Sequence, residues 1–114
     1  SKQAKKNKVW IVGGSIPLVS KDKNKIRNSC LIYDDKGNLV HRYDKIHLFG
    51  FDMGEEYYRE DKLIEAGSDV VVVDSPFGKI GIAICYDLRF PELFRVMKEI
   101  DLLVIPYLFC RCFY

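Results

Sequence analysis

Cys85 is the residue of this chain best suited to covalent chemistry. It follows Gly78-Lys-Ile-Gly-Ile-Ala-Ile84, a strand-like run of β-branched and small residues, and Pro91 then begins a helical pattern. A tight turn between such a strand and helix can expose a thiol for attack on an electrophilic carbon. An unperturbed cysteine thiol, with a pKa of about 8.5, is mostly protonated at neutral pH and needs a neighbouring base or cation. The alternative is a core thiol, because free cysteines are often buried.

Three separated segments carry a longer pattern. They read Tyr43-Asp-Lys-Ile-His-Leu-Phe49, Tyr58-Arg-Glu60 followed by Gly67, and Gly78-Lys-Ile-Gly-Ile-Ala-Ile-Cys-Tyr-Asp-Leu-Arg-Phe-Pro-Glu-Leu93. In residue types and order these segments resemble those of the nitrilase superfamily of carbon-nitrogen hydrolases, in the form seen in omega-amidases and deaminated-glutathione amidases. The resemblance covers about residues 10–106, and residues 107–114 form an atypical tail.

The resemblance implies an amidase that works through a covalent thioester. Cys85 would attack the amide carbon, ammonia would leave, and water would release the acid. The Lys45 ammonium would lie near the thiolate and stabilise the oxyanion together with the backbone N–H of Tyr86. Each such donor contributes about 3–4 kcal/mol in a preorganised site. Glu60 would orient Lys45 or relay protons.

Plainer alternatives exist for two of these residues. Lys45 can be a surface lysine at the end of a strand, and Glu60 can be one more acid in the solvated stretch 55–65. The polar neighbours His41, His47 and the Arg89/Glu92 pair are assigned to structure. His47 is interpreted as a satisfied core group, and Arg89 with Glu92 is expected to fix the turn after the nucleophile.

The elements that must position these residues follow from hydrophobic patterns. A buried strand at 9–12 ends at Gly13-Gly14, where the backbone is permissive. Segments 29–33 and 39–43 form a hairpin around loop 34–38. Further strands are predicted at 70–74, 79–84 and 102–105. Segment 50–69 reads as a long surface loop with one short helical turn, anchored by Tyr57 and Tyr58.

Two side-chain patterns predict how these elements pack. In the strand at 79–84, the isoleucines point one way, whereas Gly81, Ala83 and Cys85 point the other. A helix is predicted at 91–100, because Pro91 suits its first turn and an apolar stripe follows at Leu93, Val96, Met97 and Ile100. That helix should pack on the sheet.

Composition narrows the class of protein. The 114 residues are 48% hydrophobic and 30% charged, which fits a packed globular domain. The net charge is only +2, and the lysine clusters at 1–8 and 21–27 match no nucleic-acid module, so no nucleic-acid partner is expected. No apolar run approaches the roughly 18 residues of a spanning helix, and we expect a soluble, cytoplasmic protein with no membrane partner.

Cysteine spacing argues against metal and disulfide chemistry. The four cysteines lack paired CxxC spacing, and Cys110-Arg-Cys112 offers at most two ligands, so no metal site and no cofactor is expected. A redox role for Cys85 is a weaker alternative, because it has no resolving partner at short spacing.

The resemblance further implies an α/β fold, a central and incomplete part of an α-β-β-α sandwich formed by one domain. The family triad is Glu-Lys-Cys, and no residue here matches its first glutamate, the general base. Two interpretations stay open. The chain belongs to an amidase for small carboxylate-bearing amides, such as an omega-amide of a 2-oxo acid, or it is an inactive truncated fragment or interaction module. Family members pair as homodimers, which makes the helix at 91–100 a candidate interface.

Overall fold

Two three-stranded sheets form the centre of the computed structural model, which describes residues 1–107 apart from the side chain of Glu56. The first sheet is antiparallel, in the order β1 (Ile11–Val19), β2 (Ile26–Tyr33) and β3 (Leu39–Asp44). The second contains β6 (Val71–Ser75), β7 (Gly78–Ile82) and β8 (Leu102–Val104). Strands β6 and β7 are antiparallel, whereas β8 is parallel to β7 and is reached through helix α2 (Pro91–Val96).

Short elements complete the described chain. Helix α1 (Lys2–Asn7) precedes β1, and a hairpin of β4 (Gly50–Met53) and β5 (Glu56–Arg59) follows β3. Two 3-10 turns, η1 (Glu60–Lys62) and η2 (Cys85–Arg89), come directly after β5 and shortly after β7. None of the helices formed by the described residues has the length and apolarity to cross a membrane.

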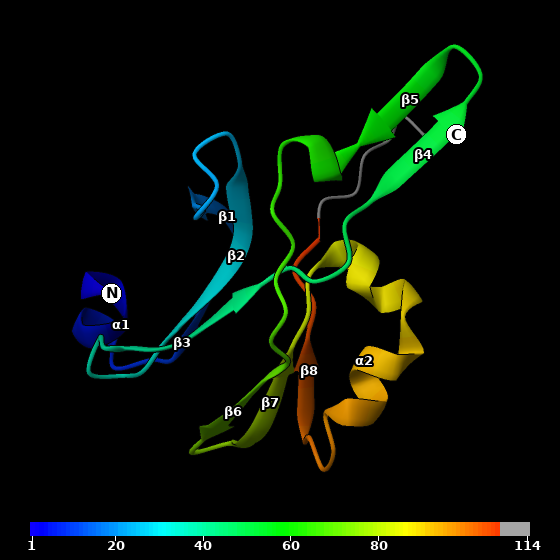
Figure 1. Cartoon of the computed structure of the whole chain (residues 1–114). Coiled ribbons are helices and arrows are strands. Elements are labelled where there is room, and N and C mark those ends of the chain that lie inside the picture. Colours follow the sequence, from blue (N-terminus) through cyan, green and yellow to red (C-terminus); the bar gives the residue numbers. More distant parts are fainter. Residues whose placement is uncertain (108–114) are drawn as a thin grey trace.

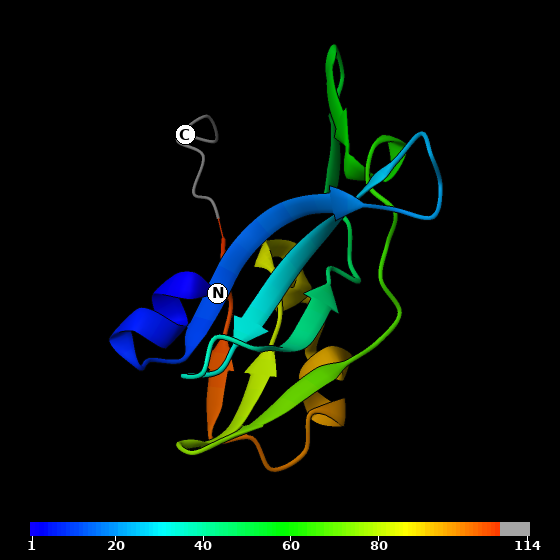
Figure 2. The same ribbon diagram turned by 90° about the vertical axis from the view of Figure 1, so that its left-hand side faces the viewer.

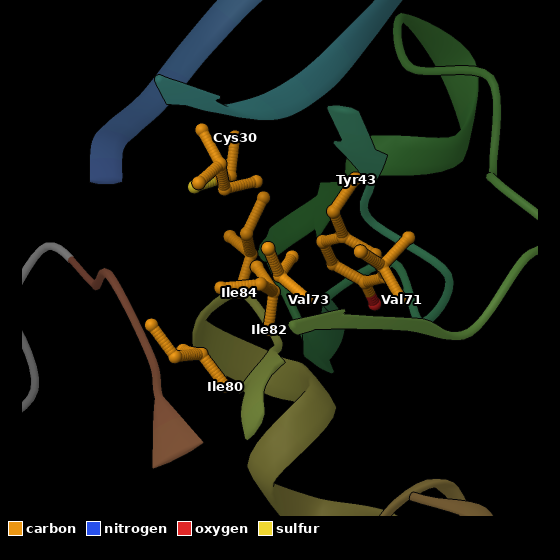
Figure 3. Close-up of a cluster of buried hydrophobic side chains, with 8 residues drawn as sticks. Cys30, Tyr43, Val71, Val73, Ile80, Ile82 and Ile84 are labelled. Atoms are coloured by element: carbon orange, nitrogen blue, oxygen red, sulfur yellow. The ribbon is translucent and has the colours of Figure 1, made fainter. Parts of the chain in front are cut away.

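The two sheets share one hydrophobic core. Figure 3 shows Cys30 and Tyr43 of the first sheet approaching the inner face of the second. The side chains of this cluster alternate along their strands, as the two-residue period of extended backbone requires. Its buried members are Cys30, Ile32, Tyr43, Val71, Val73, Ile80, Ile82 and Ile84. The predicted common face of the three isoleucines is therefore confirmed.

Helix α2 covers the opposite face of the second sheet (Figure 1). Its residue Leu93, together with Met97, packs on Ala83, and Leu103 of β8 lies against the same cluster. The layers are thus sheet, sheet and helix, which is a partial α-β-β-α arrangement as predicted from the resemblance.

Strand β1 differs from the prediction that it would end at Gly13-Gly14. It continues to Val19, and its pairing with β2 shifts register between Gly13 and Ile16. At the shift Gly14 has a φ of +48°, which glycine adopts without steric cost. The glycines therefore form a bulge inside a longer strand, because a bulge needs the same permissive backbone as a strand end.

The predicted long loop at 50–69 is also wrong in part. Its first half is the β4–β5 hairpin, which turns at Gly54 with a φ of +72°, and the expected helical turn is η1. Figures 1 and 2 show the hairpin extending away from both sheets. Tyr57 and Tyr58 are 62% and 47% exposed. The Tyr58 ring nevertheless lies 6.1 Å from the ring of Phe49, which precedes the hairpin, so the expected anchoring holds in part for Tyr58.

Helix α2 is shorter than the predicted 91–100. It ends at Val96, and the backbone turns at Glu99, which has a φ of +57°. Val96 is 63% exposed and leaves the predicted apolar stripe, whereas Met97 is 2% exposed. The predicted stripe breaks only at Val96, the last residue of the helix, because Met97 and Ile100, beyond the helix end, still pack with Ala83.

Candidate active site

Lys45 follows directly after β3 and is buried, with 1% of its surface exposed. Its backbone N–H donates to the carbonyl of Asn28 at 2.8 Å, and its own carbonyl accepts from the N–H of Gly67 at 2.8 Å. Its Nζ donates to Glu60 Oε2 at 2.7 Å. A buried ammonium group requires such a partner. The alternative of a surface lysine at a strand end is therefore excluded.

Glu60 begins η1 and pairs with both ends of the segment that carries the lysine. Besides the Lys45 ammonium, Oε2 accepts the backbone N–H of Phe49 at 2.7 Å. The Glu60 side chain is 12% exposed. Glu60 is thus a largely buried ion-pair partner and not one more acid of a solvated stretch.

Cys85 begins η2, two residues after Ala83, and its backbone has a φ of +49°. Residues other than glycine seldom adopt this left-handed conformation, which concentrates at functional sites. The turn is held by the Cys85 N–H, which donates to the carbonyl of Pro106 at 3.0 Å. Because the turn redirects the side chain, Cys85 packs against the isoleucine cluster. The predicted common face with Ala83 is wrong for this residue.

The two cysteines of the described residues have different environments. Cys30 is fully buried between the sheets, and this burial raises the pKa of its thiol to about 11. Cys85 is only partly buried. The core-thiol alternative describes Cys30, whereas Cys85 lies at a turn that leaves part of it accessible.

Asp87 is a residue whose role the sequence reasoning missed. Its carboxylate is fully buried and accepts four hydrogen bonds. Oδ1 accepts from the backbone N–H of His47 at 2.9 Å and contacts its Nδ1 at 2.8 Å. Oδ2 accepts from the hydroxyl of Tyr43 at 2.7 Å and from the N–H of Ile84 at 2.8 Å. Burial and the contact with Asp87 raise the pKa of Tyr43 far above its usual value.

Aromatic contacts add to this connection between the lysine segment and the nucleophile turn. The His47 ring stacks on Phe90 with centroids 3.7 Å apart and an angle of 8° between the planes. Phe49 meets Tyr86 edge to face at 5.1 Å. His47 therefore has the polar and ring contacts expected of it, but its side chain is 26% exposed, so it is not a core group.

Arg89, Glu92 and His41, which the sequence also assigns to structure, are exposed. Glu92 lies 3.7 Å from Arg95. The turn is held by the Cys85 N–H and by the Asp87 carboxylate, which accepts the N–H groups of His47 and Ile84, so the expected role of the Arg89/Glu92 pair is wrong. His41 is exposed on β3.

A surface hollow of about 390 Å³ lies beside the nucleophile turn. Its lining includes Tyr86, Phe49 and the paired side chains of Arg59 and Asp61. It offers both aromatic and charged groups to a small polar molecule. Within residues 1–107 no cluster of His, Cys, Asp or Glu could hold a metal ion, and Cys110 and Cys112 lie outside the described residues.

Comparison with known proteins identifies the family. Residues 1–110 match the family model described as carbon-nitrogen hydrolase. The chain belongs to the carbon-nitrogen hydrolase family. This match begins earlier than the resemblance seen at 10–106 and includes α1.

Two curated relatives of this carbon-nitrogen hydrolase chain are nitrilase homolog 2 of Dictyostelium discoideum and the human omega-amidase NIT2. They are 47% and 37% identical to it, over 94% and 93% of its length. A solved structure, the NitFhit protein of C. elegans, superposes with a TM-score of 0.85 at 33% identity over 95% of the chain. The chain spans 33% and 39% of the two relatives and 27% of the solved chain.

Proposed function

We propose that the chain carries the nucleophile and the catalytic lysine of an amidase that hydrolyses small carboxylate-bearing amides. The observation that supports this proposal is the buried Lys45–Glu60 ion pair, whose segment is hydrogen-bonded through Asp87 to the turn that bears Cys85. The name of the human relative, an omega-amidase, supports the same class of substrate.

The proposed reaction has two steps. The Cys85 thiolate attacks the amide carbon, and the carbonyl oxygen becomes an oxyanion that the Lys45 ammonium and the backbone N–H of Tyr86 stabilise. When the tetrahedral species collapses, the carbon-nitrogen bond breaks and ammonia leaves with the proton that the thiol gave up. Water then attacks the thioester, and the acid and the free thiol are released.

Glu60 is proposed to fix the direction of the lysine. An ammonium group has three N–H donors, and one of them is directed to Glu60 Oε2. Because Glu60 also accepts the N–H of Phe49, its carboxylate cannot follow a moving lysine without losing that bond. The ammonium is thereby held in one orientation, with its other donors available to a substrate oxygen.

The proton taken from the thiol requires a general base. In the family triad this base is a glutamate that no residue of the present sequence matches. The activity is therefore proposed for the longest natural gene product that contains this sequence, and the chain by itself is expected to be inactive. The same product is proposed to be a cytoplasmic homodimer.

The test combines an activity assay with chemical trapping. The longest gene product is incubated with an omega-amide of a 2-oxo acid, ammonia release is measured, and acid-quenched protein is analysed by mass spectrometry. We expect an acyl adduct on Cys85, loss of ammonia release in Cys85→Ala, and retention per folded protein in the matched variant Cys30→Ala. Unchanged hydrolysis in Cys85→Ala would disprove the proposal.

The missing general base favours a second interpretation for the isolated chain, which is an inert fragment or an interaction module. Assaying residues 1–114 alone tests it. Ammonia release that disappears in Cys85→Ala would rule out the inert alternative.

A further inference from the structure

The segment that carries the lysine has no regular secondary structure. Residues 45–49 lie between the end of β3 and the start of β4, outside any strand or helix. Two carboxylates hold this stretch and the preceding residue Tyr43 by alternating contacts. Glu60 binds Lys45 and Phe49, whereas Asp87 binds Tyr43 and His47. The course of the segment is therefore set by side-chain acceptors as well as by the backbone bonds of Lys45.

Only one of these two carboxylates also belongs to the nucleophile turn. Asp87 lies two residues after Cys85 in η2, and its Oδ2 accepts the N–H of Ile84, the residue before the nucleophile. The same oxygen accepts the hydroxyl of Tyr43 from the lysine side. A single buried oxygen thus bridges the two segments that the proposed reaction has to bring together.

We infer that Asp87 is a positioning residue that fixes the Lys45 segment against the Cys85 turn. This inference rests on the proposed function of those two residues. Asp87 does not act on the substrate. It determines how closely and in which orientation the ammonium group faces the thiolate and the oxyanion, and small displacements in such an arrangement lower rates strongly.

The chemistry of the contacts explains why a carboxylate is required. Two of the four donors, from His47 and Ile84, are backbone N–H groups directed at different oxygens. An asparagine in either amide orientation would turn an NH₂ group toward one of these N–H groups. Asp87→Asn therefore keeps the size of the side chain but breaks the bridge on one side.

The experiment measures how fast iodoacetamide alkylates Cys85 at pH 7 in the longest natural gene product, corrected for the folded fraction. The variants are Asp87→Asn, Lys45→Met and the combination of both. Tyr43→Phe serves as a milder change, because it removes one donor and leaves both backbone contacts of Asp87. Asp74→Asn is the matched control, an exposed carboxylate on β6.

We expect Asp87→Asn to slow alkylation about tenfold or more and to lower kcat with little change in KM. Tyr43→Phe should have a smaller effect in the same direction, and Asp74→Asn none. In the Lys45→Met background, Asp87→Asn should change the rate less than about twofold, since the lysine through which it acts is gone. The inference is overturned if Asp87→Asn slows alkylation of Cys85 equally with and without Lys45, or if it does not slow alkylation when Lys45 is present.

Hydrogen exchange separates this inference from the proposed function. If Lys45→Met leaves alkylation unchanged, the proposed role of the lysine fails, and the positioning role is then judged by exchange alone. Faster exchange in Asp87→Asn confined to residues 45–49 and 85–90 supports positioning. Unchanged exchange in these segments, or an equal increase throughout β6 and β7, overturns it.

Discussion

Replacing Lys45 by methionine removes a positive charge from a site that is only 1% exposed. Methionine is similar in length and apolar, so the loss of packing is small. What remains is the Glu60 carboxylate, whose side chain is 12% exposed and which keeps the N–H of Phe49 as a donor. The perturbation is therefore an uncompensated negative charge in a largely buried position.

Leaving one member of a buried ion pair without its partner costs about 3–5 kcal/mol. Because Glu60 retains a backbone donor and some exposure, we expect Lys45→Met to lower the free energy of unfolding by about 3 kcal/mol, near the lower end of this range. Adding Glu60→Gln removes the charge and leaves an amide oxygen to accept the same N–H. A neutral pair of similar volume often restores stability, so the double variant should lie within about 1 kcal/mol of the original protein.

The assay is urea unfolding at pH 7 of the longest natural gene product, with ammonia release measured on the same samples. Lys98→Met, a change of the same type at an exposed position, should alter stability by less than about 0.5 kcal/mol. Activity should be lost in both the single and the double Lys45 variants. A loss of less than about 1 kcal/mol of unfolding free energy in Lys45→Met, or a double variant that is as unstable as the single one, would contradict this account of the Lys45–Glu60 pair.

Two further predictions concern stability. Gly67→Ala places a methyl group against the backbone carbonyl of Asp44 and should lower the free energy of unfolding in urea by about 3 kcal/mol. Gly81→Ala meets the side chains of Met97 and Ile100, which can shift, and should lower it by about 1 kcal/mol. Equal losses in the two variants would contradict this. Burial raises the pKa of the Cys30 thiol to about 11. The neutral buried thiol therefore contributes fully to stability below the pKa of an unfolded cysteine, about 8.5 to 9, and this contribution is lost as the pH rises from there through 11. Between pH 8 and 10.5 the free energy of unfolding should fall by about 2 kcal/mol more in the original protein than in Cys30→Ala. An equal fall in both proteins would refute this prediction.

Local patterns predicted much of the fold. The hairpin of β2 and β3, the strands β6 to β8 and the helix on the sheet all follow from alternation, turn residues and one proline, because these features act within a few positions of each other. The predictions failed where one signal fits two structures. Gly13-Gly14 allows a bulge as well as a strand end, and the polar segment after Gly50 allows a hairpin as well as a loop.

At the candidate site, the residue types and the family could be predicted from the sequence, since each of the motifs around Lys45, Glu60 and Cys85 is a continuous stretch of the chain. The three-dimensional arrangement of the chain was needed to see that Lys45 is buried and paired with a residue 15 positions away. The same holds for the contact by which Asp87 joins Tyr43, 44 positions away, to the nucleophile turn. Burial and hydrogen bonding depend on which distant segments meet, and that information is absent from any local pattern.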